Sequence, residues 1–162
     1  MRTIVTEFEK VIEELKKQNR LDKKALIEPN FYLSYEKLYK NILTLATKVI
    51  EKTNKNEVVG IVTNRGVSTV VAMFACIYAN NPYVVIDVES PKQRVNKIIE
   101  VAKPKLILVD KHNQNQWDFF QDIASICIDI TYNDACYDKS LIKKRLEKLC
   151  LLYTSPSPRD TR

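Results

Sequence analysis

The stretch from Glu57 to Asp110 decides the fold and reads EVVGIVTNRGVSTVVAMFACIYANNPYVVIDVESPKQRVNKIIEVAKPKLILVD. Three short runs rich in Val, Ile and Leu, at 58–62, 83–87 and 106–109, have the composition of strands buried on both faces. Two stretches with helical spacing separate them. The order strand, helix, strand, helix, strand indicates two successive crossover units and therefore a parallel sheet.

Both intervening helices have recognisable ends. The first, expected at 67–79, is apolar on nearly every side, which predicts protein contacts on more than one face. The Asn-Asn-Pro run beginning at Asn80 ends it, because Asn tolerates the left-handed conformation and Pro cannot continue a helix. For the second helix, Ser90 is the expected N-cap, Pro91 the first helical residue and Pro104 the stop.

The flanking segments complete the predicted architecture. On the N-terminal side we expect a helix at 6–17, a hairpin of two strands at 24–27 and 31–34, and a long helix with Ser34 as its N-cap. Past Asp110 the expected elements are a short helix, a strand and a basic amphipathic helix, at 117–123, 126–130 and 140–149. The sequence therefore predicts an α/β fold: a mostly parallel sheet with flanking helices, preceded by a helix and a short hairpin.

Composition limits the class of protein. The chain has 162 residues, 45% hydrophobic and 28% charged, as in an ordinary globular domain. It contains no apolar run of about 20 residues and no apolar leader after Met1, so we expect a cytoplasmic location and no membrane contact. The net charge of +6 comes from scattered lysines. Its densest cluster, at 143–148, predicts a solvated helix face and no nucleic-acid partner.

The cysteine pattern argues against a metal site. The four cysteines lack the close pairing typical of zinc sites, and His112 is the single histidine. Cys76 lies in an apolar helix and is interpreted as a small core residue. We expect neither a bound metal nor a disulfide.

Two motifs carry a family resemblance. Residues 77–87 read IYANNPYVVID and are followed by PKQR at 91–94, while residues 33–38 read LSYEKL. The first pair resembles the segment Leu-Lys-Ala-Gly-x-Ala-Tyr-Val-Pro-Ile-Asp, then Pro-x-x-Arg, of the adenylate-forming ligases. The second resembles their Leu-Thr/Ser-Tyr-x-Glu-Leu. The resemblance is closest to the adenylation domains of nonribosomal peptide synthetases and to the D-alanine–carrier protein ligases, and it runs from Ala25 to Asp110.

The matches are interrupted at a few positions. The family glycine is Asn80, the proline before Ile-Asp is Val85, and the capping glutamate after Ser34 is replaced by Lys37. The matching positions in the longer motif are Ala79, Tyr83, Val84, Ile86, Asp87, Pro91 and Arg94.

The resemblance implies a larger parent enzyme. Residues 1–149 would be the N-terminal portion of an AMP-binding domain, inactive as given. The parent would use ATP and magnesium to activate a carboxylic acid, expected to be an amino acid, as acyl-AMP. It would then transfer the acyl group to a carrier-protein thiol. A start at Met1 favours a stand-alone or initiating unit.

This chain offers no phosphate cradle. In the family, that loop resembles Tyr-Thr-Ser-Gly-Ser/Thr-Thr-Gly-x-Pro-Lys-Gly, whose glycines let backbone N–H groups close on phosphate oxygens. The two glycines here are Gly60, inside a strand, and Gly66, at the start of a helix. Gly66 could bind an anion at the helix N-terminus, but a turn glycine is the favoured interpretation. Asp87 ends a strand where α/β sheets place ligands, but a turn or cap role is favoured. We therefore assign no catalytic, cofactor-binding or metal residue.

The last segment, 150–162, reads CLLYTSPSPRDTR. Tyr153 begins a Tyr-Thr-Ser run about where the family loop should start, so one interpretation is a degenerate loop. Pro156, however, stands where a glycine is needed, and proline removes a backbone donor. Residues 150–160 also match, without a gap, the direct translation of a common transposon-type sequencing adaptor, CLLYTSPSPRD. We therefore expect a non-native, disordered tail without function.

Two alternatives from other classes stay open at this point. One is a small doubly wound α/β binding or signalling domain, complete as it stands. The other is a non-catalytic basic interaction module. The open reading frame after Leu149 discriminates between them and the ligase, since the ligase requires several hundred further residues.

Overall fold

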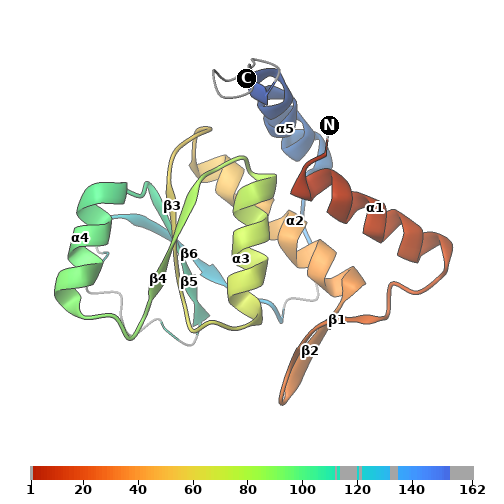
Figure 1. Ribbon diagram of the computed structural model, residues 1–162, viewed down its shortest axis with the longest axis horizontal. Coiled ribbons are helices and arrows are strands. Elements are labelled where there is room, and N and C mark those ends of the chain that lie inside the picture. The colour runs from red at the N-terminus through yellow and green to blue at the C-terminus, as the bar shows by residue number, and fades with distance from the viewer. Residues whose placement is uncertain (1, 112, 114–119, 121, 132–134, 154–162) are drawn as a thin grey trace, which may run out of the picture.

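The computed structural model (Figure 1) describes residues 2–111, 113, 120, 122–131 and 135–153. Its elements are α1 (Ile4–Lys17), β1 (Lys24–Glu28), β2 (Phe31–Ser34), α2 (Tyr35–Lys52), β3 (Val59–Thr63), α3 (Val67–Tyr78), β4 (Tyr83–Asp87), α4 (Lys92–Ala102), β5 (Leu106–Asp110), β6 (Ala124–Ile128) and α5 (Lys139–Tyr153). The predicted fold class is confirmed: β1 and β2 form an antiparallel hairpin, and the other strands form a parallel sheet.

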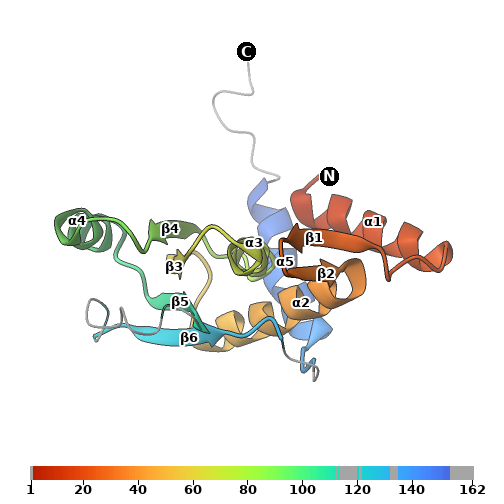
Figure 2. The same cartoon turned by 90° about the horizontal axis from the view of Figure 1, so that it is seen from below.

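The parallel sheet has the strand order β4-β3-β5-β6. From β3 the chain crosses through α3 to β4, then returns through α4 over β3 to reach β5. Figure 2 shows α4 on one side of the sheet and α2 and α3 on the other. Every residue of β3 is buried, as the apolar run at 58–62 predicts for a strand covered on both faces.

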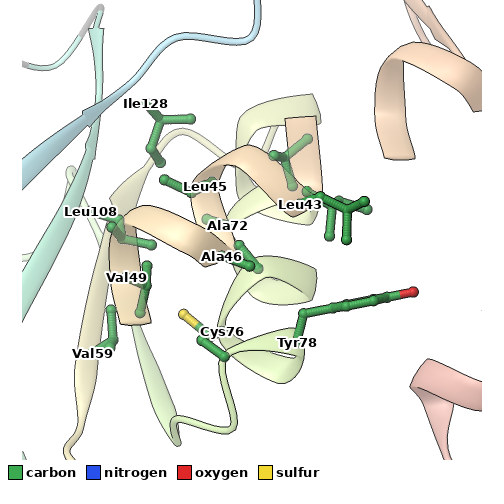
Figure 3. Close-up of a cluster of buried hydrophobic side chains, with 14 of the residues drawn as sticks. Leu43, Leu45, Ala46, Val49, Val59, Ala72, Cys76, Tyr78, Leu108 and Ile128 are labelled. Atoms are coloured by element: carbon green, nitrogen blue, oxygen red, sulfur yellow. The ribbon is translucent and has the colours of Figure 1, made fainter. Parts of the chain in front are cut away.

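The larger core lies between the sheet and helices α2 and α3 (Figure 3). Small residues let these two helices approach each other and the sheet, among them Ala46 of α2 and Ala72 and Cys76 of α3, all fully buried. Leu108 of β5 and Val59 of β3 face them from the sheet. Burial on several faces of α3 confirms the expectation from its nearly uniform apolar composition.

A smaller core lies on the opposite face, under α4. Val95 of this helix packs against alternate strand residues, and Phe120 joins the cluster from the β5–β6 connection. Gly60 is needed here for space: a Cβ at this position would lie 2.5 Å from Ile107 Cδ1. The two cores together exploit the alternation of side chains along the strands.

The N-terminus of α4 corrects one prediction. The N-cap is Pro91 and not Ser90, and Pro91 is extended, with φ −57° and ψ 145°. The Ser90 N–H donates to the Asp87 carbonyl at 3.0 Å, so a turn precedes the helix. The helix begins one residue later than expected because Ser90 belongs to this turn. By contrast, Asn80 has the predicted left-handed conformation, with φ 56°.

The bounds of the two C-terminal elements differ from those expected from the sequence. Strand β6 begins and ends two residues earlier than expected, and α5 continues through Tyr153, so residues 150–153 are helical where disorder is expected. Leucine is a good helix former, and Leu151 and Leu152 extend the helical run. Most of the short helix predicted around Trp117, and residues 154–162, lie outside the described residues. Within the described part of the chain, no helix combines the length and apolarity needed to cross a membrane.

Candidate functional site

The carboxyl edge of the parallel sheet is the candidate site. The chain leaves β3 toward β4 and leaves β5 toward β6, so the two central strands send their connections in opposite directions. Open α/β sheets bind ligands outside the carboxyl ends of strands at such a switch point. The residues that reach this edge include Thr63, Arg65, Gly66, Asp87 and Asp110.

Asp87 is held as a turn residue at this edge. Its Oδ1 accepts the Glu89 N–H at 3.0 Å, and its carbonyl accepts the Ser90 N–H at the same distance. Its Oδ2 lies 3.6 Å from the guanidinium of Arg65, whose side chain is 91% exposed, so this ion pair contributes little stability. The geometry agrees with the turn interpretation drawn from the sequence.

The N-terminus of α3 carries an anion supplied by the protein itself. Glu28, from the hairpin, accepts the Val67 N–H at 2.7 Å through Oε1. The N-cap residue Gly66 makes no side-chain cap hydrogen bond. A carboxylate is favourable here because the first N–H groups of a helix are unpaired and carry partial positive charge. The position at which Gly66 could have bound an external anion is therefore filled by Glu28.

Gly66 has a steric reason for being glycine. Its φ of −115° and ψ of −166° are open to any residue. A Cβ would lie 2.6 Å from Glu28 Oε1 and 3.2 Å from the Asn64 carbonyl oxygen. The sequence alone could not identify Glu28, which lies 39 residues before Val67. The one sequence feature that pointed to a distant capping group was Gly66 itself, which has no side chain to cap α3.

A hollow of about 170 Å³ opens beside this edge, between α2 and the end of β6. Lys40 and Glu36, both in its wall, form an ion pair at 3.1 Å. Asp129, also in the wall, accepts the Thr131 hydroxyl and backbone N–H, and these bonds lower the pKa of its carboxyl. These charges are already compensated within the protein.

Metal binding and a glycine-rich phosphate loop each place requirements on the described residues. Among them, no group of three or more His, Cys, Asp or Glu side chains could hold a metal ion. The chain's two glycines lie elsewhere: Gly60 is inside the sheet beside Ile107, and Gly66 is in contact with the Glu28 carboxylate. The described residues therefore do not provide the glycine-rich phosphate loop expected from the family motif.

The buried titratable groups are not activated for chemistry. Tyr39 and Tyr78 both donate to the Glu9 carboxylate at 2.9 Å, and burial together with this carboxylate raises the pKa of both hydroxyls. Burial raises the pKa of the Cys76 thiol to about 12. Raised pKa values keep these groups protonated, so they act as donors and core residues and not as nucleophiles.

Comparison with known proteins identifies the family. The family model described as "AMP-binding enzyme" matches residues 12–159. The chain therefore belongs to the AMP-binding enzymes, the adenylate-forming ligase superfamily expected from its motifs. The match extends into the segment 150–162, and the non-native origin expected for that segment stays a prediction.

Peptide synthases are among the relatives. The chain is 31% identical over 91 residues to tyrocidine synthase 1 from Brevibacillus parabrevis, a match that covers 56% of this chain and 8% of that protein. It is 26% identical over 132 residues to gramicidin S synthase 2 from Brevibacillus brevis, covering 81% of this chain and 3% of that protein. The chain thus spans less than a tenth of the length of either relative.

Solved structures share the fold. The crystal structure of the nonribosomal peptide synthetase FmoA3 in its AMPPNP-bound form matches with a TM-score of 0.68 and 20% identity, covering 80% of this chain and 14% of that one. The structure of IdnL1 matches with a TM-score of 0.56. The arrangement of sheet and helices is therefore that of one part of a much larger protein.

Proposed function

We propose that this chain is the N-terminal portion of a ligase that activates an amino acid as its acyl-AMP and passes the acyl group to a carrier-protein thiol. The observation that carries the proposal is the AMP-binding family match over residues 12–159. Relatives that are tyrocidine and gramicidin S synthases support an amino acid substrate and a carrier-protein partner. A cytoplasmic location, expected from the sequence, belongs to the same proposal.

The described residues would serve this enzyme as a scaffold. ATP and magnesium belong to the whole ligase, where positioning and electrostatic stabilisation of phosphate charge supply catalysis. The family motif at 33–38 acts structurally here, because Ser34 Oγ accepts the Lys37 N–H at 3.3 Å and caps α2. The second motif, at 77–87, forms the end of α3 and all of β4.

The domain limits form part of the proposal. Residues 1–149 are the native N-terminal portion of the AMP-binding domain, and residues 150–162 derive from a sequencing adaptor. The gap-free match of 150–160 to the translated adaptor supports this assignment. The native continuation would supply the glycine-rich loop that Gly60 and Gly66 cannot form.

Amino-acid-dependent exchange of pyrophosphate into ATP tests the proposal. We expect no exchange above the acid-free control from the chain as given, and exchange with at least one amino acid from the full-length enzyme encoded by the source genome. Exchange by the chain as given would overturn the fragment interpretation. A full-length protein inactive with every amino and carboxylic acid offered would overturn the ligase assignment.

A further inference from the structure

Arg145 of α5 reaches the C-terminal end of α2. Its guanidinium donates to the carbonyl oxygens of Ile50 at 3.1 Å and Thr53 at 2.6 Å, and lies 3.5 Å from Asn81 Oδ1. The last carbonyls of a helix are unpaired and carry partial negative charge. A cation with several donors in one plane suits this place, because it can satisfy more than one carbonyl at once.

The side chain of Asn81 is held so that its Oδ1 can accept a hydrogen bond from Arg145. The residue is 4% exposed, and its Nδ2 donates to the carbonyls of Asn54 at 3.0 Å and Glu57 at 2.9 Å. Because both amide hydrogens are used by the α2–β3 connection, Oδ1 faces Arg145 and the Thr53 hydroxyl. Position 81 is the variable position of the family motif, so the motif does not predict this contact.

The Arg145 guanidinium is partly buried beside these acceptors. Burial lowers the pKa of the Arg145 guanidinium, while the negative charge of Glu57 raises it. Losing the cation would leave the carbonyls of the buried residues Ile50 and Thr53 without this donor. This loss weakens the attachment of α5.

Polar contacts near both ends of one stretch of α5 attach it to α2. The Asp138 N–H, just before α5, donates to the Thr47 hydroxyl at 3.1 Å, and Arg145 contacts residues 50 and 53 further along. Ile142 is buried between them. Helix α5 crosses α2 (Figure 2), and the Arg145 contact lies at the C-terminal end of α2, at the amino edge of the sheet, before β3 begins.

We infer that Arg145, held by Asn81, is a positioning residue that fixes the place from which the native chain continues after Leu149. A following strand parallel to the sheet would start at this amino edge and end at the carboxyl edge, where ligands bind. The consequence for nucleotide binding rests on the proposed function: the phosphate-binding segment of the ligase would start from the place that Arg145 sets. The docking itself does not depend on that proposal.

Hydrogen exchange in the chain as given tests the docking. Arg145→Met keeps an unbranched stem and removes the donors, and Lys144→Met is the matched control on the exposed side of the same helix. We expect the protection of amides at 142–147 to fall about tenfold in the first variant, the loss for about one strong hydrogen bond. We expect a change of less than about twofold in the control.

A double-mutant cycle tests the pairing with Asn81. If the two side chains act together, Asn81→Ala lowers this protection in the parent background and has a smaller effect in Arg145→Met. Additive effects, or Arg145→Met behaving like Lys144→Met, would overturn the inference.

The consequence for nucleotide binding is tested in the full-length enzyme. Arg145→Met should raise KM for ATP about tenfold with a smaller change in kcat, and Arg145→Lys should recover part of the loss. A fall in kcat alone would mean lost folded enzyme and would reject the positioning role. A full-length protein without any activity would reject the proposed function. The amide hydrogen exchange of the chain as given would still decide whether Arg145 docks α5.

Discussion

The inner and outer helices of this protein are attached by different means. Helices α2 and α3 lie against the sheet through a continuous apolar core. The outer helices α1 and α5 also bury apolar side chains, and each adds long-range polar contacts through one residue, Glu9 in α1 and Arg145 in α5. Apolar burial repeats along the sequence with a period that can be recognised. A polar attachment is a single pair of residues far apart in the chain.

The largest effect is expected from a cavity in the inner core. Leu108 is fully buried between the sheet and α2. Leu108→Ala should lower the free energy of unfolding by about 3 kcal/mol, through lost burial and the cavity left behind. Urea unfolding followed by circular dichroism measures it. Val101→Ala on α4, where the side chain is 76% exposed, is the control and should change stability by less than about 0.5 kcal/mol.

The attachment of α1 should come second. Glu9→Ala leaves the hydroxyls of Tyr39 and Tyr78 without their acceptor, and Tyr78 is almost fully buried. We expect a loss of about 2 kcal/mol, the usual cost of an unpaired buried polar group. Glu13→Ala, at an exposed position of the same helix, is the control. Equal effects of the two substitutions in urea unfolding would show that the tyrosine contacts do not attach α1.

The two helix caps allow a direct comparison of local and long-range contacts. Ser34→Ala removes the cap of α2, and Glu28→Ala removes the carboxylate at α3; each should cost about 1 kcal/mol. Only the long-range cap should show coupling. Gly66→Ala should lower the free energy of unfolding in the parent chain, because its Cβ would meet Glu28 Oε1. In a chain that already carries Glu28→Ala, the same substitution should cost much less. Equal costs in both backgrounds, measured by urea unfolding, would contradict this.

The smallest effect on stability at neutral pH is expected from the ionisation of the Tyr39 and Tyr78 hydroxyls, which matters only in alkaline solution. The folded-state pKa values of Tyr39 and Tyr78 lie above the ordinary value of 10.0. Their contribution to stability is therefore complete below pH 10 and declines above it, because the unfolded chain releases these protons first. Ultraviolet titration should show a late-ionising fraction that shrinks in Tyr78→Phe. A titration in which all tyrosines ionise together while the chain stays folded would refute this.

Much of the fold could be predicted because its signals are local. Ser34 as N-cap, Asn80 as left-handed helix end and the apolar run of β3 each act within a few residues of themselves. The start of α4 was wrong by one residue, because the turn built on Asp87 includes Ser90. Whether Ser90 caps the helix or joins the preceding turn depends on local backbone geometry, which residue propensities for helix caps and turns do not describe.

The candidate site was less predictable. The sequence drew attention to Gly66 and Asp87, for which a turn role was favoured, but it gave no sign of Glu28, whose carboxylate lies at the helix terminus beside Gly66. Arg145 was interpreted as part of a solvated basic face, and the structure places its guanidinium against α2. Both contacts join residues separated by several helices and strands, and only the folded chain brings them together.

The central claim is that native residues 1–149 continue into the rest of an adenylate-forming ligase. Independent sequencing reads of the source DNA across Leu149 test it most directly. We predict that they replace residues 150–162 with a different sequence that reaches a glycine-rich Thr-Ser-Gly loop soon afterwards. Reads from the genome that reproduce the codon for Pro156 would contradict the claim, and the Tyr-Thr-Ser run at Tyr153 would then stand as a degenerate native loop.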